Sequence, residues 1–290
     1  MSSQASDSSY ISDPGSASEL SRLLYQDRLL TTQMGGLLAD QDDVTLTALR
    51  HVLDLACGPG GWVLDMASTY PQAQISGVDI SELMVGYAQT QGIELGCANA
   101  DFRVMDATRP LDFPSDHFDL VNARFLSTFM PTRRWPPFLS ECMRFLRPGG
   151  TLRVTDLEFG MSNSPAHERM CGICIQAMMA GGISFSVDGR HLGMLPMLGR
   201  LMEDAGVQRI QRKPYLVDYS TGSAVHHAWY RDLLQVWKLG RPFVIGSGVV
   251  AAAEFDQVYH QCRREMVAEN FCAIWFFATM FGTKSSGEGQ

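Results

Sequence analysis

The sequence HVLDLACGPGG at residues 51–61 decides the fold expected for this chain. It begins with a short apolar run, which is typical of a buried parallel strand. A glycine-rich turn follows, and the next residues, WVLDMA at 62–67, have the spacing of a helix. Together these parts form a ligand cradle, because small residues admit a ligand and free backbone N–H groups at a helix start attract its polar parts.

Two details distinguish this loop from that of a nicotinamide-binding protein. Asp54 lies inside the strand, where such proteins are normally apolar, and Val63 replaces the third glycine of G-x-G-x-x-G. An acid before the loop suits a ligand with an ammonium and a sulfonium group. The segment from Asp54 to Gly60 resembles the first motif, D-x-A-C-G-x-G, of class I S-adenosylmethionine-dependent methyltransferases. The resemblance assigns Asp54, Gly58 and Gly60 to the cofactor S-adenosylmethionine.

A second acid follows the next expected strand, residues 74–79. Asp79 stands at the carboxyl end of that strand, about 20 residues past the glycine loop, where an acid hydrogen-bonds ribose hydroxyls. The alternative interpretation is a helix cap. If Asp79 binds the ribose, we expect Ile80 to pack against the adenine and Met84 to cover it.

The resemblance supplies the other cofactor residues. An Asp-Ala pair faces the adenine in the family, and Asp106 and Ala107 match it just beyond the third strand. Asn122 and Arg124, at the carboxyl end of the fourth strand, are expected to form the floor of the cofactor pocket. The turn LRPGG at 146–150 recurs in the family, although a simple helix stop explains it equally well.

The resemblance covers about residues 45–160 and implies an α/β fold. We expect a Rossmann-like, seven-stranded, mostly parallel sheet with helices on both faces and the final strand, 271–278, inserted antiparallel. Residues 1–44 are predicted to form a tail and a lid helix. Residues 45–282 are predicted to form the methyltransferase domain.

The predicted lid begins with a helix. Its apolar pattern runs over residues 19–38, and the helix is expected to end at Gly35-Gly36. Tyr10 and Tyr25 are candidate cofactor contacts, and packing on the core alone is the alternative. Insertions at about 160–197 and 220–253 are expected to complete the lid and line a substrate pocket. The first is rich in methionine, which suits a bulky apolar substrate or ordinary core filling.

Composition excludes several classes of protein. The formal net charge of -8 argues against a nucleic-acid partner. There is no apolar run long enough for a membrane span, and residues 1–14 are too polar for a signal peptide. Seven cysteines without framework spacing indicate a reduced, cytoplasmic protein. The C-x-x-C at 171–174 has no partner ligands nearby in sequence, so no metal is expected, and the oligomeric state is left open.

The predicted reaction is methyl transfer to a small-molecule acceptor by in-line displacement. The resemblance is strongest to quinone-pathway and natural-product methyltransferases, and the insertions favour an apolar or aromatic acceptor. One alternative is a protein of this fold that binds the cofactor but acts as a cyclase or binding module. A less favoured alternative is an NAD-dependent oxidoreductase, which Asp54, Val63 and the lack of a Tyr-x-x-x-Lys pair oppose.

Methyl transfer to a hydroxyl releases a proton, so the prediction includes a general base. His226 and His227 are the catalytic candidates, because imidazole titrates near neutral pH and their insertion is expected over the carboxyl ends of the strands. His191 and Glu158 are the reserves. Adjacent residues seldom face one pocket, so packing or a surface position is the alternative for the pair.

Overall fold

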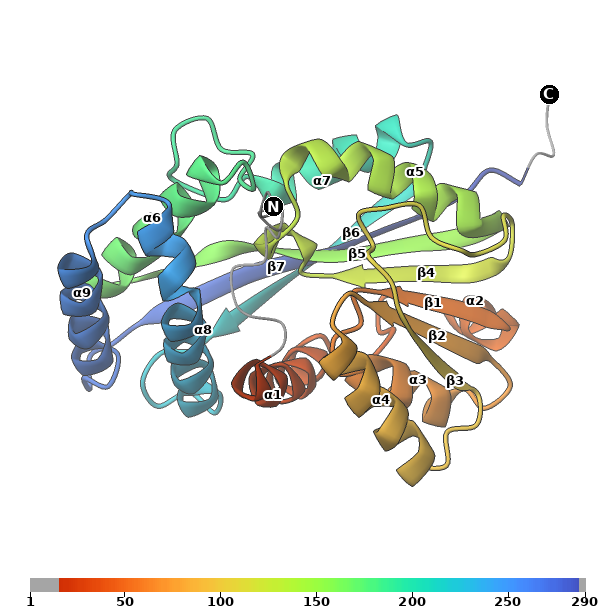
Figure 1. Ribbon diagram of the computed structural model, residues 1–290, viewed down its shortest axis with the longest axis horizontal. Helices are drawn as coiled ribbons and strands as arrows, with labels where there is room; N and C mark the ends of the chain where they lie inside the picture. The colour runs from red at the N-terminus through yellow and green to blue at the C-terminus, as the bar shows by residue number, and fades with distance from the viewer. Residues whose placement is uncertain (1–15, 287–290) are drawn as a thin grey trace, which may run out of the picture.

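The computed structural model describes residues 16–286, and its centre is one seven-stranded sheet (Figure 1). The strands are β1 (His51–Leu55), β2 (Gln74–Asp79), β3 (Ala100–Val104), β4 (Phe118–Arg124), β5 (Leu146–Ser162), β6 (Gln208–Asp218) and β7 (Ala273–Thr283). Their order across the sheet is β3-β2-β1-β4-β5-β7-β6. Strand β7 pairs antiparallel with β5 and β6, whereas the other neighbours pair parallel. The predicted α/β fold with an inserted antiparallel strand is confirmed.

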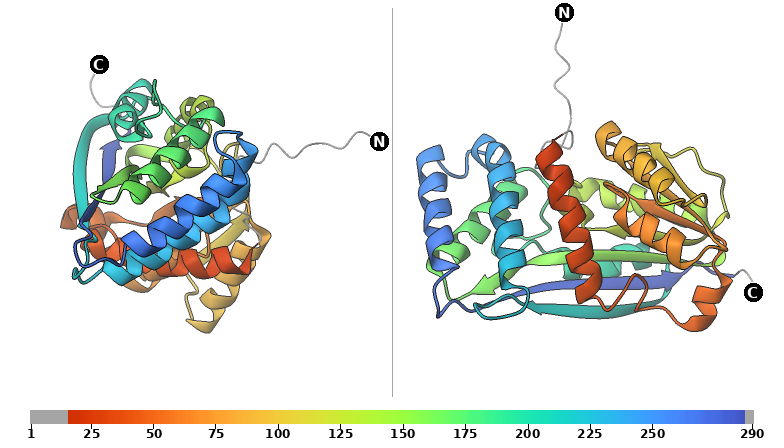
Figure 2. Two further views of the ribbon diagram at one scale, coloured as in Figure 1. Left: turned by 90° about the vertical axis from the view of Figure 1, so that its left-hand side faces the viewer. Right: turned by 90° about the horizontal axis from the view of Figure 1, so that it is seen from below.

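Helices cover both faces of the sheet. They are α1 (Ala17–Gln33), α2 (Asp43–Ala48), α3 (Gly61–Thr69), α4 (Glu82–Glu94), α5 (Trp135–Phe145), α6 (Pro165–Ala180), α7 (Met194–Asp204), α8 (His226–Gly246) and α9 (Ala252–Glu265), with short 3₁₀ helices η1 (Leu126–Thr128) and η2 (Thr132–Arg134). Figure 1 shows α5 and α7 on one face and α1, α3, α4 and α8 on the other. In Figure 2, α9, α8, α1 and α3 lie side by side along the sheet.

Local sequence explains where several elements begin. Apolar side chains fill β1 on both faces, and the glycine loop then leads into α3. Helix α4 begins after Ser81, whose hydroxyl accepts a hydrogen bond from the Met84 N–H. Helix α6 begins in the same way, because Ser164 accepts from the His167 N–H and Pro165 occupies the first turn.

Some boundaries differ from the prediction. Helix α1 begins two residues before the predicted start and ends at Gln33, just before the predicted stop at Gly35-Gly36, whose positive φ angles a helix does not allow. Strand β5 runs over residues 146–162 instead of 151–156, and the LRPGG segment forms its irregular first part. The predicted lid insertions consist mainly of α6 and the 21-residue α8.

Strands β5 and β7 are longer than β1 to β4, and their extra length extends the sheet past the ends of those four strands. Helices α6, α8 and α9 pack together over this extension. A single cluster of buried apolar side chains runs from Leu53 of β1 through Met170 of α6 to Phe277 of β7. The two halves of the chain therefore share one hydrophobic core.

Candidate active site

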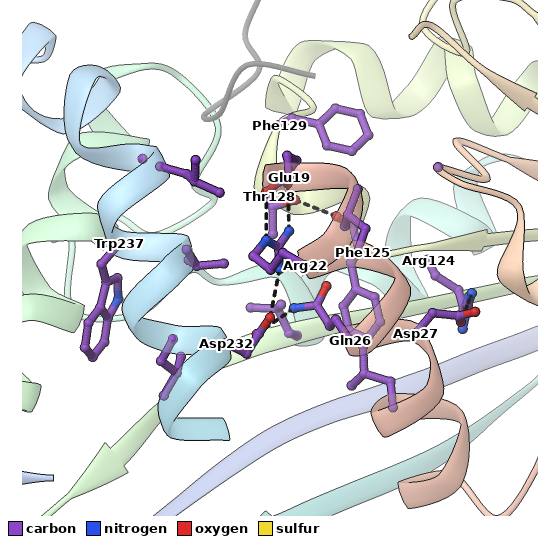
Figure 3. A pocket seen from close by; sticks show the side chains of 18 of the residues that line it. Glu19, Arg22, Gln26, Asp27, Arg124, Phe125, Thr128, Phe129, Asp232 and Trp237 are labelled. Atoms are coloured by element: carbon purple, nitrogen blue, oxygen red, sulfur yellow. Dashed lines mark hydrogen bonds and ion pairs between the residues drawn. The ribbon is translucent and has the colours of Figure 1, made fainter. Parts of the chain in front are cut away.

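A cavity of about 250 Å³ lies between α1, α6, α8 and the sheet. One end, here the glycine-loop end, is lined by Asp54, Gly58, Asp79 and Arg124. The other, here the aromatic end, is lined by His167, Tyr219, Trp229 and Trp237. Figure 3 shows Arg124 and Trp237 on opposite sides of this space, with side chains of α1 between them.

Asp54 is buried at the glycine-loop end and is fixed by a chain of polar side chains. Asn122 Nδ2 donates to Asp54 Oδ1 over 2.7 Å, and Asn122 Oδ1 accepts from Arg153 Nη1 at 2.7 Å. Arg153 pairs with Asp40 at 2.8 Å, and both side chains are fully buried. Burial raises the pKa of Asp54 to about 6. Asn122 is not among the described cavity-lining residues, so it supports Asp54 from behind.

Asp79 lines the cavity and also holds the glycine loop. Its carboxylate accepts from the Gly58 N–H at 2.9 Å and from the Ser81 N–H at 2.9 Å. Burial raises the pKa of Asp79, although these hydrogen bonds act in the opposite direction. One carboxylate thus orders the loop while it faces the cavity.

Gly60 and Gly61, which follow Pro59, allow neighbouring side chains to pack closely against the loop. Gly60 has φ +79°, and a Cβ there would lie 2.6 Å from Phe102 Cε1 and 2.7 Å from Ala88 Cβ. A side chain at Gly61 would collide with the Asp27 carboxylate of α1. Helix α1 therefore lies directly on the glycine loop, and Gly60 itself is not one of the described residues lining the cavity.

Exposed apolar side chains lie beside Asp79. Ile80 is 51% exposed, and Val104, which pairs with Asp79 in the sheet register, is 48% exposed. Met84 is buried. The surface next to Asp79 is therefore apolar and open, as a bound flat ring would require.

Asp106 and Ala107 follow β3 at the edge of the sheet where Asp79 ends the neighbouring parallel strand β2. Asp106 accepts from the Thr108 N–H at 2.9 Å and from Arg109 Nε at 3.1 Å. Ala107 packs partly buried against the core. Neither residue, nor Ile80 or Met84, belongs to the described lining of the cavity.

Charged side chains of α1 cross the middle of the cavity. Arg22 donates to both carboxylate oxygens of Glu19 at 2.7 and 2.8 Å and to Asp232 of α8 at 3.2 Å. Gln26 donates to the other Asp232 oxygen at 2.9 Å. These four residues, here the Arg22 cluster, are connected by the dashed lines in Figure 3. Burial alone would lower the pKa of Arg22, but its two acidic partners raise it, so the cation persists.

A second ion pair lies at the glycine-loop end. Arg124 Nη2 donates to Asp27 Oδ1 at 2.7 Å, and both side chains line the cavity. Burial alone would lower the pKa of Arg124, but Asp27 and Asp54 outweigh it and raise that pKa. The acids that line the cavity are Glu19, Asp27, Asp54, Asp79 and Asp232. Five carboxylates face two guanidinium groups, so the cavity favours a positively charged ligand.

The aromatic end has few polar atoms. Its walls carry the rings Phe125, Phe129, Phe159, Tyr219, Trp229, Trp237, Phe243 and Trp275. His167 Nε2 lies 2.8 Å from the Tyr219 hydroxyl, and both side chains are buried. Burial lowers the pKa of His167 to about 4, so the imidazole is neutral at neutral pH.

Comparison with known proteins now adds to this geometry. Residues 52–150 match a family model described as a methyltransferase domain. Over these residues the chain is similar to the class I S-adenosylmethionine-dependent methyltransferases that its motifs resemble. It is 24% identical over 226 residues to the methyltransferase pytC of Aspergillus terreus, a match that covers 76% of this chain and 64% of that protein. It is 31% identical over 165 residues to phosphoethanolamine N-methyltransferase 1 of Triticum aestivum, covering 57% of this chain and 30% of that protein.

The matched segments span less than two thirds of these curated relatives. Among solved structures, the YcgJ protein of Bacillus subtilis superposes with a TM-score of 0.52 at 18% identity, covering 85% of this chain and all of that one. That likeness concerns the fold. Apart from Phe125 and Phe129, the rings of the aromatic end lie after residue 150, outside the segment that matches the methyltransferase domain.

The charge of the cavity lining complements the cofactor of the methyltransferase family. S-adenosylmethionine carries a sulfonium and an ammonium group, and the excess of carboxylates over guanidinium groups complements them. Within residues 16–286, no group of three or more His, Cys, Asp or Glu side chains is placed to hold a metal ion. None of the helices described there combines the length and hydrophobicity needed to cross a bilayer.

The structure does not bring the predicted base candidates to the cavity. His226 is buried, and its Nδ1 donates to the Tyr219 carbonyl at 2.9 Å, whereas His227 is exposed. Both lie in the first turn of α8, whose later residues Trp229 and Asp232 face the cavity instead. Neither histidine is part of the cavity wall formed by the described residues.

The reserve candidates are also placed elsewhere. Glu158 accepts from the N–H groups of Leu192, Gly193 and Leu195 at 2.8 to 3.2 Å and so holds the start of α7. His191 is exposed. Tyr25 is 46% exposed and lies outside the described cavity lining, and Tyr10 lies outside the described residues.

His167 is the histidine that the sequence analysis missed. It lies in the first turn of α6 and reaches Tyr219, which is 52 residues away in the chain. The start signal Ser164-Pro165 would have located the helix. No local pattern indicates that this helix turns His167 toward a cavity.

Proposed function

We propose that the protein transfers the methyl group of S-adenosylmethionine to a small apolar or aromatic acceptor. The observation that carries this proposal is one cavity with a carboxylate-lined glycine-loop end and an aromatic end. The first end suits a cationic cofactor, and the second suits a flat apolar molecule. The electronegative lining agrees with a small-molecule partner rather than a nucleic acid.

Several residues would hold the cofactor at the glycine-loop end. Asp54 would bind the ammonium group, and Asp79 would bind the ribose hydroxyls. Ile80, with Val104, offers an apolar surface for the adenine, beside Asp106 and Ala107, which the family resemblance assigns to that base. Gly58 lets the cofactor approach the loop backbone, and Gly60 shapes the loop through its packing.

Arg124 and Asn122 complete the proposed cofactor site in different ways. Arg124 lines the cavity and presents a cation that can pair with the cofactor's carboxylate. Asn122 acts through Asp54, because its amide orients that carboxylate from the side away from the cavity.

The bound cofactor supplies an electrophilic methyl carbon. The protein's own task is to align the acceptor with that carbon and to exclude water, since in-line displacement depends on orientation. Helix α1 covers the glycine loop, and the Arg22 cluster joins α1 to α8 over the cavity. Apolar rings close the rest of the wall.

Incubation with methyl-labelled S-adenosylmethionine and a panel of aromatic acceptors tests this function. We expect the label to appear in acceptor products detected by mass spectrometry. Calorimetric titration should show binding of S-adenosylhomocysteine and no binding of NAD. Binding without any methylated product would support the cyclase or binding-module alternative, and tight NAD binding would contradict the proposal.

A further inference from the structure

Three polar side chains interrupt the apolar wall of the aromatic end. His167, Tyr219 and Trp229 all line the cavity, and each is buried to at least 98%. His167 packs edge-on against Trp237, at 5.6 Å between ring centroids, and Tyr219 lies 6.3 Å from Trp229. Polar groups placed this deeply in an aromatic pocket usually orient a ligand.

Tyr219 and His167 form a pair with spare accepting capacity. Their polar atoms are 2.8 Å apart. Burial raises the pKa of Tyr219, so its hydroxyl stays protonated, and neutral His167 keeps one unprotonated ring nitrogen. Whichever partner donates, the tyrosine oxygen retains a lone pair that can accept a hydrogen bond.

Trp229 offers the complementary group. Its indole Nε1 is buried and has no hydrogen-bond partner among the described residues. A buried N–H left unpaired is costly, and the indole nitrogen is a donor only. A ligand oxygen in the aromatic end would pair it.

The carboxylates nearest this end are already paired. Glu19 and Asp232 both bind Arg22, and Asp232 also accepts from Gln26. An ammonium acceptor would therefore compete with a buried guanidinium, whereas a neutral hydroxyl would not. The pocket favours an oxygen nucleophile over an amine.

We propose that the methyl acceptor is a phenol with a second oxygen on its ring, whose hydroxyl donates to Tyr219 and whose other oxygen accepts from Trp229. This inference rests on the proposed methyltransferase function and adds the acceptor's chemistry to it. Tyr219 and His167 act as a relay for the hydroxyl proton.

The step balances in atoms and charge. The phenol oxygen forms a bond to the methyl carbon, the carbon–sulfur bond breaks, and its electron pair stays on sulfur, which becomes neutral. The hydroxyl proton passes to the Tyr219 oxygen while the Tyr219 proton passes to His167 Nε2. Because the oxygen gains positive charge as the new bond forms, its proton is acidic enough for a weak base to accept.

The experiment compares three small probes with the full chain and labelled S-adenosylmethionine. The probes are meta-methoxyphenol, meta-cresol, which lacks the second oxygen, and meta-methoxybenzylamine, whose amine is protonated at neutral pH. We expect methylation of both phenols and none of the benzylamine. KM should be about twofold to tenfold higher for the cresol, the worth of one hydrogen bond.

Trp229→Phe should remove that difference between the two phenols, since the ring stays and only the N–H is lost. Trp135→Phe is the matched control, because its Nε1 is equally buried and unpaired among the described residues but lies at the start of α5, outside the described cavity wall. We expect the control to keep the wild-type KM ratio. An unchanged ratio in Trp229→Phe would contradict the assigned contact.

The relay is tested with His167→Gln and Tyr219→Phe. Both should lower kcat for meta-methoxyphenol by about 10²-fold or more, with unchanged affinity for S-adenosylhomocysteine. The loss should shrink for para-nitrophenol at mildly alkaline pH, because that acceptor is already deprotonated. An equal loss for both acceptors would assign the pair a purely structural role and overturn the relay.

The results also separate this inference from the function on which it rests. Methylation of the benzylamine but of neither phenol would overturn the acceptor class and leave the methyltransferase function intact. If the protein bound no S-adenosylhomocysteine and methylated no probe, the proposed function would fail first.

Discussion

Asp54 is the cavity carboxylate whose ionisation should set the pH dependence of cofactor binding. Burial raises its pKa to about 6, so the proton is bound below that pH and released above it. Only the ionised form attracts an ammonium group. Affinity for S-adenosylhomocysteine should therefore fall as the pH decreases through about 6, by up to about tenfold per pH unit. Calorimetry across this range measures it.

The variant Asp54→Asn is the control for that pH dependence. It should bind more weakly at neutral pH and show a flatter profile, since its amide does not titrate. A profile as steep as that of the wild type would assign the titration to another group, such as Asp79, whose pKa burial also raises.

Asp79 should contribute to binding through both its contacts and its hold on the loop. Asp79→Ala is expected to weaken S-adenosylhomocysteine binding by about 1.5–3 kcal/mol, roughly ten- to a hundredfold, since hydrogen bonds to a charged group are lost. Titration calorimetry measures the change. Asp101→Ala, on the exposed part of β3, should leave affinity unchanged. A folded Asp79→Ala protein with wild-type affinity would remove Asp79 from the site.

At the residue scale, sequence located the acids of the site better than its other members. Asp54 and Asp79 are tied to strand ends and a glycine loop, and those are local features. Asn122 was expected in the pocket floor, but its side chain is directed to Asp54 and Arg153. His167 depends on how α6 packs against β6, which no nearby residue specifies.

At the scale of elements, α1 should behave as a cover that ligand binding closes. Its side chains line the cavity, and Asp27 lies on the glycine loop. Backbone amides of α1 should therefore gain hydrogen-exchange protection when S-adenosylhomocysteine binds. Mass-spectrometric exchange with and without ligand tests this, with α9 as the reference because it is absent from the cavity wall described here. Equal exchange in α1 would make the helix purely structural.

The Arg22 cluster should hold α1 against α8. Arg22→Met removes the cation and leaves Glu19 and Asp232 buried without it, which typically costs about 3–5 kcal/mol of stability. Denaturant unfolding measures the loss. The control Arg28→Met changes an exposed arginine on the same helix and should cost little. A loss as small as that of the control would show that the cluster does not stabilise the closed arrangement.

The elements differ in how far sequence could predict them. Strands β1 to β4, which precede β5, have apolar runs bounded by glycine or acidic residues, so their positions were predicted closely. Helix α8 was missed, because Gly240, Pro242 and Gly246 interrupt its pattern and only tertiary packing compensates for them. The place of β7 between β5 and β6 came from the family resemblance, since pairing over such separations has no local signal.

At the scale of the whole molecule, the two ends of the cavity come from different parts of the chain. The glycine loop and the strand ends beside it lie in the segment that matches the methyltransferase domain. Most rings of the aromatic end lie after that segment, with Phe125 and Phe129 as the exceptions. The sheet and the apolar core nevertheless run through both parts without a break. Residues of the aromatic end can therefore change to suit another acceptor while the glycine-loop end stays the same. The two parts of the chain that form these ends should nevertheless fold as one unit.

Thermal unfolding tests whether the two parts of the chain fold as one cooperative unit. Because the core is shared, the protein should unfold in one transition, and S-adenosylhomocysteine should stabilise both ends together. Ligand at about 100 times its Kd adds about 2.7 kcal/mol, which raises the Tm of a chain of 290 residues by about 4–5 °C. Far-ultraviolet dichroism follows the whole chain. Tryptophan fluorescence is measured in the double variant Trp62→Phe/Trp135→Phe, which keeps only Trp229, Trp237 and Trp275, all at the aromatic end. The ligand should raise the Tm measured by dichroism and the Tm measured by fluorescence by the same amount. A fluorescence Tm that does not change with ligand would show that the two parts of the chain unfold independently.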